Sequence, residues 1–164
     1  MTDAAGEYVA RDMLTRLTRS ADGPGRSGPA PPPSGVLEYE LPDGWQAFAG
    51  RTDAANDYVS IKLAKPNDRW FHVRGMPGGH VVLRVGADRE PDRATLERAA
   101  GLAAYHSKAR TGGVVPVSMT EGRHVSKPRG AKPGTVEIRK ETVLKVRPLD
   151  DEQVAAMRRD ASTR

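Results

Sequence analysis

The fold of this 164-residue chain is decided by Trp70-Phe71-His72-Val73-Arg74-Gly75-Met76-Pro77-Gly78-Gly79-His80-Val81-Val82-Leu83-Arg84-Val85. Two runs rich in apolar and β-branched residues flank a segment of glycine and proline, which predicts two antiparallel strands joined by a loop. Side chains in a strand alternate between its two faces. One face of this hairpin is therefore a core surface, made of Phe71, Val73, Val81, Leu83 and Val85.

The opposite face of the hairpin depends on the register of the two strands. If Arg74 pairs with His80, this face carries Trp70, His72, Arg74, His80 and Arg84, because directly opposed residues point to the same side. Aromatic rings beside cations suit RNA, since an unstacked base can lie on a ring while arginine binds phosphate. The alternative is that Trp70 and His72 pack and form hydrogen bonds within the fold, and a slipped register favours it.

The rest of the chain predicts an α+β fold around this hairpin. We expect a single domain with an antiparallel sheet and one packed central helix, Thr95 to Ala109, whose alanines allow a close approach to the sheet. A second helix runs from Thr52 or Asp53 to about Leu63, and a third is expected within Asp150 to Ala161. The other expected strands are 44–50, 114–117, 135–139 and 142–147, with a loop from Thr120 to Gly134.

Composition shifts along the chain predict its domain boundaries. We expect a short amphipathic helix, Glu7 to Arg19, within residues 1–20, and a disordered linker over residues 21–35, which are rich in proline and glycine. The domain proper spans residues 36–148, followed by a tail or short helix over 149–164.

The residue content excludes several classes of protein. The chain has no cysteine, so we expect no disulfide, no thiolate nucleophile and no cysteine-bound zinc. Its start does not resemble a secretory signal, and no stretch approaches the roughly 20 apolar residues that span a bilayer. A cytoplasmic protein without cofactor, bound metal or membrane partner is expected.

Positive charge is concentrated in one part of the chain. Between Ser107 and Arg147 stand ten Lys or Arg against three Glu, which gives +7 there, whereas the whole chain carries +5. A basic segment of this kind attracts a polyanion, because neutralised phosphates release counterions. Within it, the run His124 to Gly134 can present Lys127, Arg129 and Lys132 to consecutive phosphates. A merely solvated basic loop is the alternative.

Several separated motifs resemble one known family. The motifs are Gly50-Arg51 with Asn56-Asp57-Tyr58, the stretch Pro66 to Val82, Ala103-Ala104-Tyr105-His106-Ser107-Lys108-Ala109-Arg110, Val115-Pro116-Val117, and Val125 to Gly134. Their order and spacing over about Gly44 to Val146 are similar to the NFACT-R domain, the RNA-binding part of proteins that act in ribosome-associated quality control. Two positions depart from the family pattern: Gly79 stands where serine is usual, and Met119-Thr120 where a Tyr-Thr pair is usual.

The resemblance implies a non-catalytic RNA-binding domain. Its expected partner is tRNA or rRNA, including the large ribosomal subunit, and not DNA. The residues expected to bind RNA are Arg51, Asn56, Asp57, Asp68, Trp70, His72, Arg74, His80, Lys108, Arg110, Lys127, Arg129 and Lys132.

Two other functions remain open at this point. The Glu7 to Arg19 helix and the linker suit an adaptor that binds a protein partner. A hydrolase using His72, His80 and Asp68 with a metal is the weaker alternative, since the two histidines lack the helical spacing of metal ligands.

Overall fold

The computed structural model describes residues 31–159, so the expected helix Glu7 to Arg19 and most of the expected linker lie outside the described residues. The chain divides into two units, Met1–Pro31 and Pro32–Arg164. The fold below belongs to the second unit.

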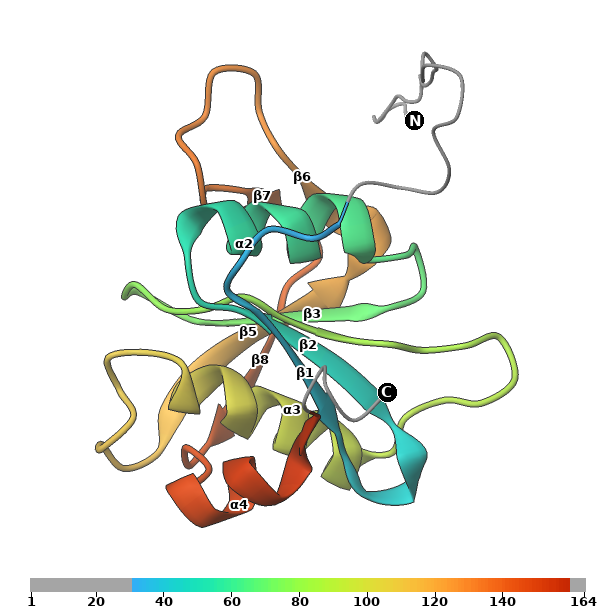
Figure 1. Ribbon diagram of the computed structural model, residues 1–164, viewed down its shortest axis with the longest axis vertical. Coiled ribbons are helices and arrows are strands. Elements are labelled where there is room, and N and C mark those ends of the chain that lie inside the picture. The colour runs from blue at the N-terminus through green and yellow to red at the C-terminus, as the bar shows by residue number, and fades with distance from the viewer. Residues whose placement is uncertain (1–30, 160–164) are drawn as a thin grey trace. The chain divides into compact units, whose positions relative to one another are not determined.

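A seven-stranded sheet forms the centre of the fold (Figure 1). Its strands lie in the order β8-β5-β3-β4-β2-β1-β9, and each neighbouring pair is antiparallel. Their bounds are β1 Val36–Glu40, β2 Gln46–Gly50, β3 Arg69–Val73, β4 Val81–Leu83, β5 Val115–Glu121, β8 Thr142–Val146 and β9 Arg158–Arg159. A separate small sheet pairs β6 (Val125–Ser126) with β7 (Glu137–Ile138). The predicted α+β class with an antiparallel sheet is confirmed.

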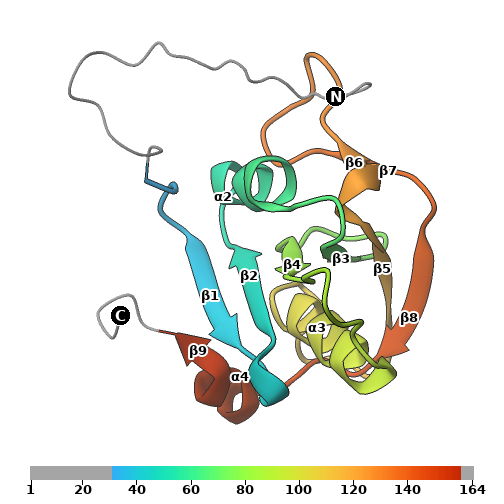
Figure 2. The ribbon, with the colours of Figure 1, turned by 90° about the vertical axis from the view of Figure 1, so that its right-hand side faces the viewer.

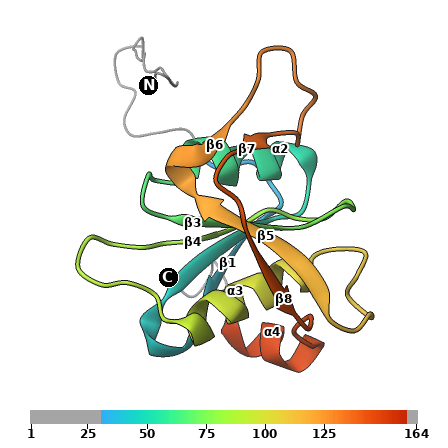
Figure 3. The same ribbon diagram turned by 180° about the vertical axis from the view of Figure 1, so that it is seen from behind.

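Helices cover both faces of the large sheet (Figures 1 and 2). On one side lies α2 (Asp53–Asp57), which continues into the π-helical turn η2 (Tyr58–Leu63), with β6 and β7 beside it. On the other side lie α3 (Arg93–Tyr105) and the short α4 (Asp151–Met157), as the view from behind also shows (Figure 3). Short 3-10 turns occur at η1 (Pro42–Gly44) and η3 (Gly122–His124).

The helix starts follow from their capping residues. Thr52 accepts a hydrogen bond from the backbone N of Ala55 at 3.0 Å, and Asp92 accepts one from Thr95 at 2.9 Å. Such caps satisfy backbone donors that a helix leaves unpaired at its start. The predicted start at Thr52 or Asp53 is therefore confirmed, whereas the central helix begins two residues earlier than Thr95 and ends at Tyr105.

Two apolar cores lie on the two faces of the sheet. The larger one joins the sheet to α3, whose residues Ala99 to Ala104 are all buried. Small side chains there let the helix lie close to the strands, as predicted. The smaller core consists of Val59, Trp70 and Val82, with partly buried residues of η2, β6 and β7 around it.

The expected register of the hairpin is wrong by two residues. Trp70 pairs with Val82 and Phe71 with Val81, whereas the expected pairing put Trp70 opposite Arg84. A shift of two residues keeps every side chain on its predicted face, because the side-chain period of a strand is two. The predicted division into faces is therefore correct, but η2 covers the polar face, and Trp70 is only 3% exposed.

Other boundaries also differ from the prediction. The strand expected over 114–117 extends as β5 to Glu121, because all of β3 pairs with it. The strand β1 and the edge strand β9 were not predicted. β1 pairs with the next strand, β2, whereas β9 pairs with β1, which is distant in the sequence.

Candidate nucleic-acid interface

Trp70 and His80 are joined by a buried hydroxyl. The indole Nε1 of Trp70 donates to Ser60 Oγ at 2.8 Å, and Ser60 Oγ lies 2.8 Å from His80 Nδ1. Indole is a donor only, so Ser60 accepts from it and keeps its own hydrogen free for the histidine. Ser60 was missed from the sequence, because nothing in its spacing indicates which strand residues its helix covers.

Asn56 fixes the histidine from the same helix. Its Oδ1 accepts from the backbone N of His80 at 2.9 Å, and both residues are buried. Trp70, His80 and Asn56 therefore support the fold from within. The expectation that Trp70 is displayed to a base is wrong for this structure, and for Trp70 the alternative of packing within the fold holds.

The two hairpin histidines are held neutral. Burial lowers the pKa of His80 to about 3, with a smaller contribution from the nearby His72. Burial also lowers the pKa of His72, whose ring centroid lies 5.0 Å from that of His80. Of the three neighbouring rings, those of Trp70, His72 and His80, only the His72 side chain is partly exposed to solvent.

Asp68 links the turn before β3 to the end of β4 through hydrogen bonds. The carboxylate is fully buried and accepts from the backbone N atoms of Lys65 and Val85, each at 2.8 Å. It also forms an ion pair with Arg84 at 2.5 Å. All of these partners are internal, so Asp68 lies away from any surface that RNA could reach.

The basic loop, residues 127–136, is clamped onto α2 through Lys127. Its ammonium donates to the carbonyl oxygens of Lys132 at 2.6 Å and Thr135 at 2.9 Å, and lies 3.3 Å from Asp57 Oδ1. The same carboxylate oxygen accepts from the backbone N of Gly134 at 3.0 Å. An ammonium has three hydrogens, and three acceptors surround this one. The donors of Lys127 are therefore occupied within the protein, and this side chain holds the shape of the loop.

Arg129 and Lys132 are the free cations of that loop. Both are exposed, and neither side chain has an ion pair or hydrogen bond within residues 31–159. The clamp thus leaves two cations on a shaped loop that projects beyond α2 (Figure 1).

The remaining expected cations surround the hairpin loop Gly75–Gly79. The backbone N of Gly79 donates to the carbonyl of His106 at 2.7 Å, and that of Gly50 to His80 at 3.0 Å. These bonds bring three distant segments to one end of the sheet, with Arg51, Lys108 and Arg110 exposed there. Arg74 is exposed as well but is paired with Glu141 at 3.1 Å.

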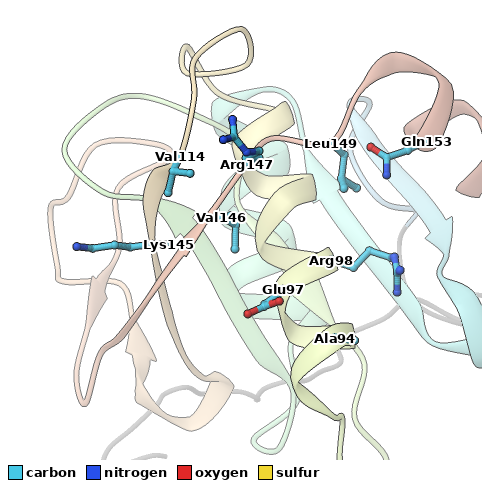
Figure 4. A pocket seen from close by; sticks show the side chains of 9 residues that line it. All are labelled: Ala94, Glu97, Arg98, Val114, Lys145, Val146, Arg147, Leu149 and Gln153. Carbon is cyan, nitrogen blue, oxygen red and sulfur yellow. The ribbon is translucent and has the colours of Figure 1, made fainter.

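Residues of α3 and β8 line an open groove of about 430 Å³ (Figure 4). Arg98, Lys145 and Arg147 line it together with Glu97 and several apolar side chains. None of the residues expected to bind RNA lines the groove.

The described residues contain no group of three or more metal-ligating side chains. Among the same residues, no helix is both long and apolar enough to cross a membrane.

Comparison with known proteins gives consistent matches. The family model described as "NFACT protein RNA binding domain" matches residues 36–140. The protein named "Rqc2 homolog RqcH" from Bacillus subtilis is 41% identical over 121 residues, which are 73% of this chain and 21% of the relative. Its namesake from Streptococcus suis is 41% identical over 104 residues, 63% of this chain and 18% of the relative. The chain thus spans about a fifth of the length of these relatives.

A solved structure shares the fold. It is the C-terminal part of the fibronectin/fibrinogen-binding protein from Streptococcus suis, with a TM-score of 0.69, 36% identity, and coverage of 75% of this chain and 49% of that chain. Sequence, motif order and fold agree, and the chain belongs to the NFACT protein RNA-binding domain family, a family of non-catalytic RNA-binding domains.

Proposed function

We propose that this chain binds structured RNA, either tRNA or rRNA of the large ribosomal subunit, in a translation or quality-control setting. The observation that carries the proposal is the clamped basic loop with Arg129 and Lys132 free at its surface. Family membership and the likeness to RqcH support it.

In this proposal the protein contacts the phosphates of the RNA backbone, and no base stacks on Trp70. A phosphate contact needs only an accessible cation, whereas stacking needs an accessible ring, and Trp70 is covered. His72, the partly exposed ring beside it, is the remaining candidate for contact with a base or ribose.

Shaping the loop in advance lowers the entropic cost of binding. A flexible chain loses conformational entropy when it binds. A loop held by Lys127 and Asp57 has already lost that entropy on folding. Such a loop also places its cations at fixed positions, which favours RNA of a defined shape.

Recovery of the tagged chain from cells, with and without nuclease treatment, tests the proposal. We expect the chain to sediment with the large subunit or to carry tRNA, and nuclease to release it. Sequencing of RNA crosslinked to the chain identifies the species. A protein partner retained after complete RNA digestion, with no crosslinked RNA, would contradict the proposal and indicate an adaptor.

A further inference from the structure

A second group of cations lies on the α3 face of the sheet, away from the basic loop. Its centre is a hydrogen bond of 2.8 Å between the Tyr39 hydroxyl and His106 Nε2. Tyr39 comes from β1, and His106 follows the last turn of α3. The pair therefore joins the sheet to the end of the helix.

The Tyr39–His106 pair carries no charge at neutral pH. Burial raises the pKa of Tyr39 to about 12 and lowers that of His106 to about 4. Three guanidinium groups, those of Arg110, Arg51 and Arg158, lie near enough to His106 to contribute to the lower pKa. The hydroxyl of Tyr105, the residue before His106, donates a hydrogen bond to Asp151 at 2.8 Å.

Strand geometry places Arg158 beside Tyr39 and Arg51 on the same face of the sheet. Arg158 is directly opposite Tyr39 in the pairing of β9 with β1, so the two side chains point to the same face. Arg51 follows Ala47 and Ala49 in the alternation of β2, and these alanines belong to the core on the α3 face. Figure 2 shows β9 alongside β1 at this edge of the sheet.

Arg110 reaches the same place from the segment after α3. Its guanidinium lies 4.0 Å from the centroid of the Tyr105 ring, and its Nε donates to the Tyr105 carbonyl at 2.9 Å. The terminal nitrogens remain for an external acceptor. Arg51 and Arg158 are exposed, and neither forms an ion pair with the part of the chain that the structure describes.

We infer that Arg51, Arg110 and Arg158 form a phosphate-binding site over the Tyr39–His106 pair, which takes a backbone phosphate of the bound RNA. The inference rests on the proposed function and extends the RNA footprint to the α3 face. Guanidinium groups from three distant segments lie near His106, and their planar N–H donors match the geometry of phosphate. Arg158 lies outside residues 36–140, the range that the family model matches.

The two residues of β9 provide a matched pair of variants. Arg159 stands next to Arg158 but points to the opposite face, where it pairs with Glu40 at 2.7 Å. R158A and R159A therefore remove the same charge from the same strand, and only R158A removes a group from the proposed site.

The test is the affinity of the full chain for tRNA across a salt series, with thermal melting of each variant as a check of folding. For R158A we expect affinity about fivefold weaker and a slope of log K against log salt smaller by about 0.7–0.9, the value for one lost phosphate contact. R51A should show the same loss of affinity and the same change of slope as R158A. R159A should match the wild type in both.

Two failures are distinguishable. If the wild-type chain binds tRNA but R158A and R159A behave identically, the arginine site is wrong and the proposed function stands. If the wild-type chain binds neither tRNA nor ribosomal RNA, the proposed function fails and this site fails with it.

Discussion

Lys127 Nζ lies 3.3 Å from Asp57 Oδ1, an oxygen that also accepts a hydrogen bond from the backbone N of Gly134. One carboxylate on α2 thus holds both ends of the basic loop. Asp57 was expected among the RNA-binding residues, although a carboxylate repels phosphate. In the proposed function Asp57 acts by shaping the basic loop and does not touch RNA.

Replacement of Asp57 separates loop shape from charge. D57A removes one negative charge, which by itself should strengthen RNA binding, but it also releases the loop. We expect affinity for tRNA to fall by about threefold or more, because ordering of the loop must then occur on binding. D88A is the matched control, since Asp88 is an exposed acid between β4 and α3, apart from the basic loop. Tighter binding by D57A would show that the loop acts through its charge alone.

Lys127 and Arg129 should differ although both are cations of one loop. K127A should speed amide hydrogen exchange over residues 131–139, because it removes the donor to the Lys132 and Thr135 carbonyls. R129A should leave exchange unchanged and reduce the salt slope of RNA binding. Equal exchange rates in K127A and the wild type would contradict the clamp.

Asp68 is expected to matter for stability. D68A removes the ion-pair partner of Arg84 and leaves two backbone N–H groups without their acceptor. We therefore expect a loss of about 3–5 kcal/mol in the free energy of unfolding, measured with denaturant. If D68A does not fold, D68N gives a milder test. E90Q breaks the exposed Arg69–Glu90 pair and should change little. A D68A protein as stable as the wild type would refute the internal role of Asp68.

Stability should fall as the solution is acidified below the ordinary histidine pKa. The pKa of His80 is about 3 in the folded chain and near 6.5 in the unfolded chain, so only the unfolded state takes up the proton between these values. Each such histidine costs about 1.4 kcal/mol per pH unit in this window, and His106, with a pKa of about 4, adds to the effect. The stability of H80Q should depend less on pH from 6 to 4. The same slope in H80Q and wild type would contradict the assignment.

Gly79 has no space for a side chain. A Cβ there would lie 2.4 Å from the Gly50 carbonyl oxygen, so the serine that is usual in the family should clash in this chain. We expect G79S to lower the free energy of unfolding by about 1–3 kcal/mol. G113A is the control, because nothing lies within 4 Å of a Cβ at Gly113. Unchanged stability in G79S would show that the loop adjusts freely.

Local patterns predicted most of the elements of this fold. Alternation in the hairpin gave its two faces correctly, and the alanine-rich helix packs on the sheet as expected, because period and side-chain size act over neighbouring residues. The register was wrong by two, since an even shift leaves the pattern of faces unchanged. The strand β9, only two residues long, depends wholly on pairing with β1.

The roles of the site residues were harder to predict. Trp70 and Arg129 are both residue types that bind RNA, but Trp70 is buried and Arg129 is exposed. The burial of Trp70 depends on where η2 lies across the sheet. In the sequence, Lys127 looks like the other cations of the basic loop, Arg129 and Lys132. Its acceptors are two carbonyl oxygens and a distant carboxylate, which spacing does not reveal.

The central claim is tested most directly by the salt dependence of tRNA binding in the wild-type chain and in an R129A/K132A double variant. We predict a linear fall of log K with log salt, and a slope smaller by about 1.4–1.8 in the double variant, the value for two lost phosphate contacts. An R93A/R159A control, which removes equal charge from side chains paired with Glu97 and Glu40, should keep the wild-type slope. A flat salt response, or the same slope in the double variant as in the wild type, would contradict the account.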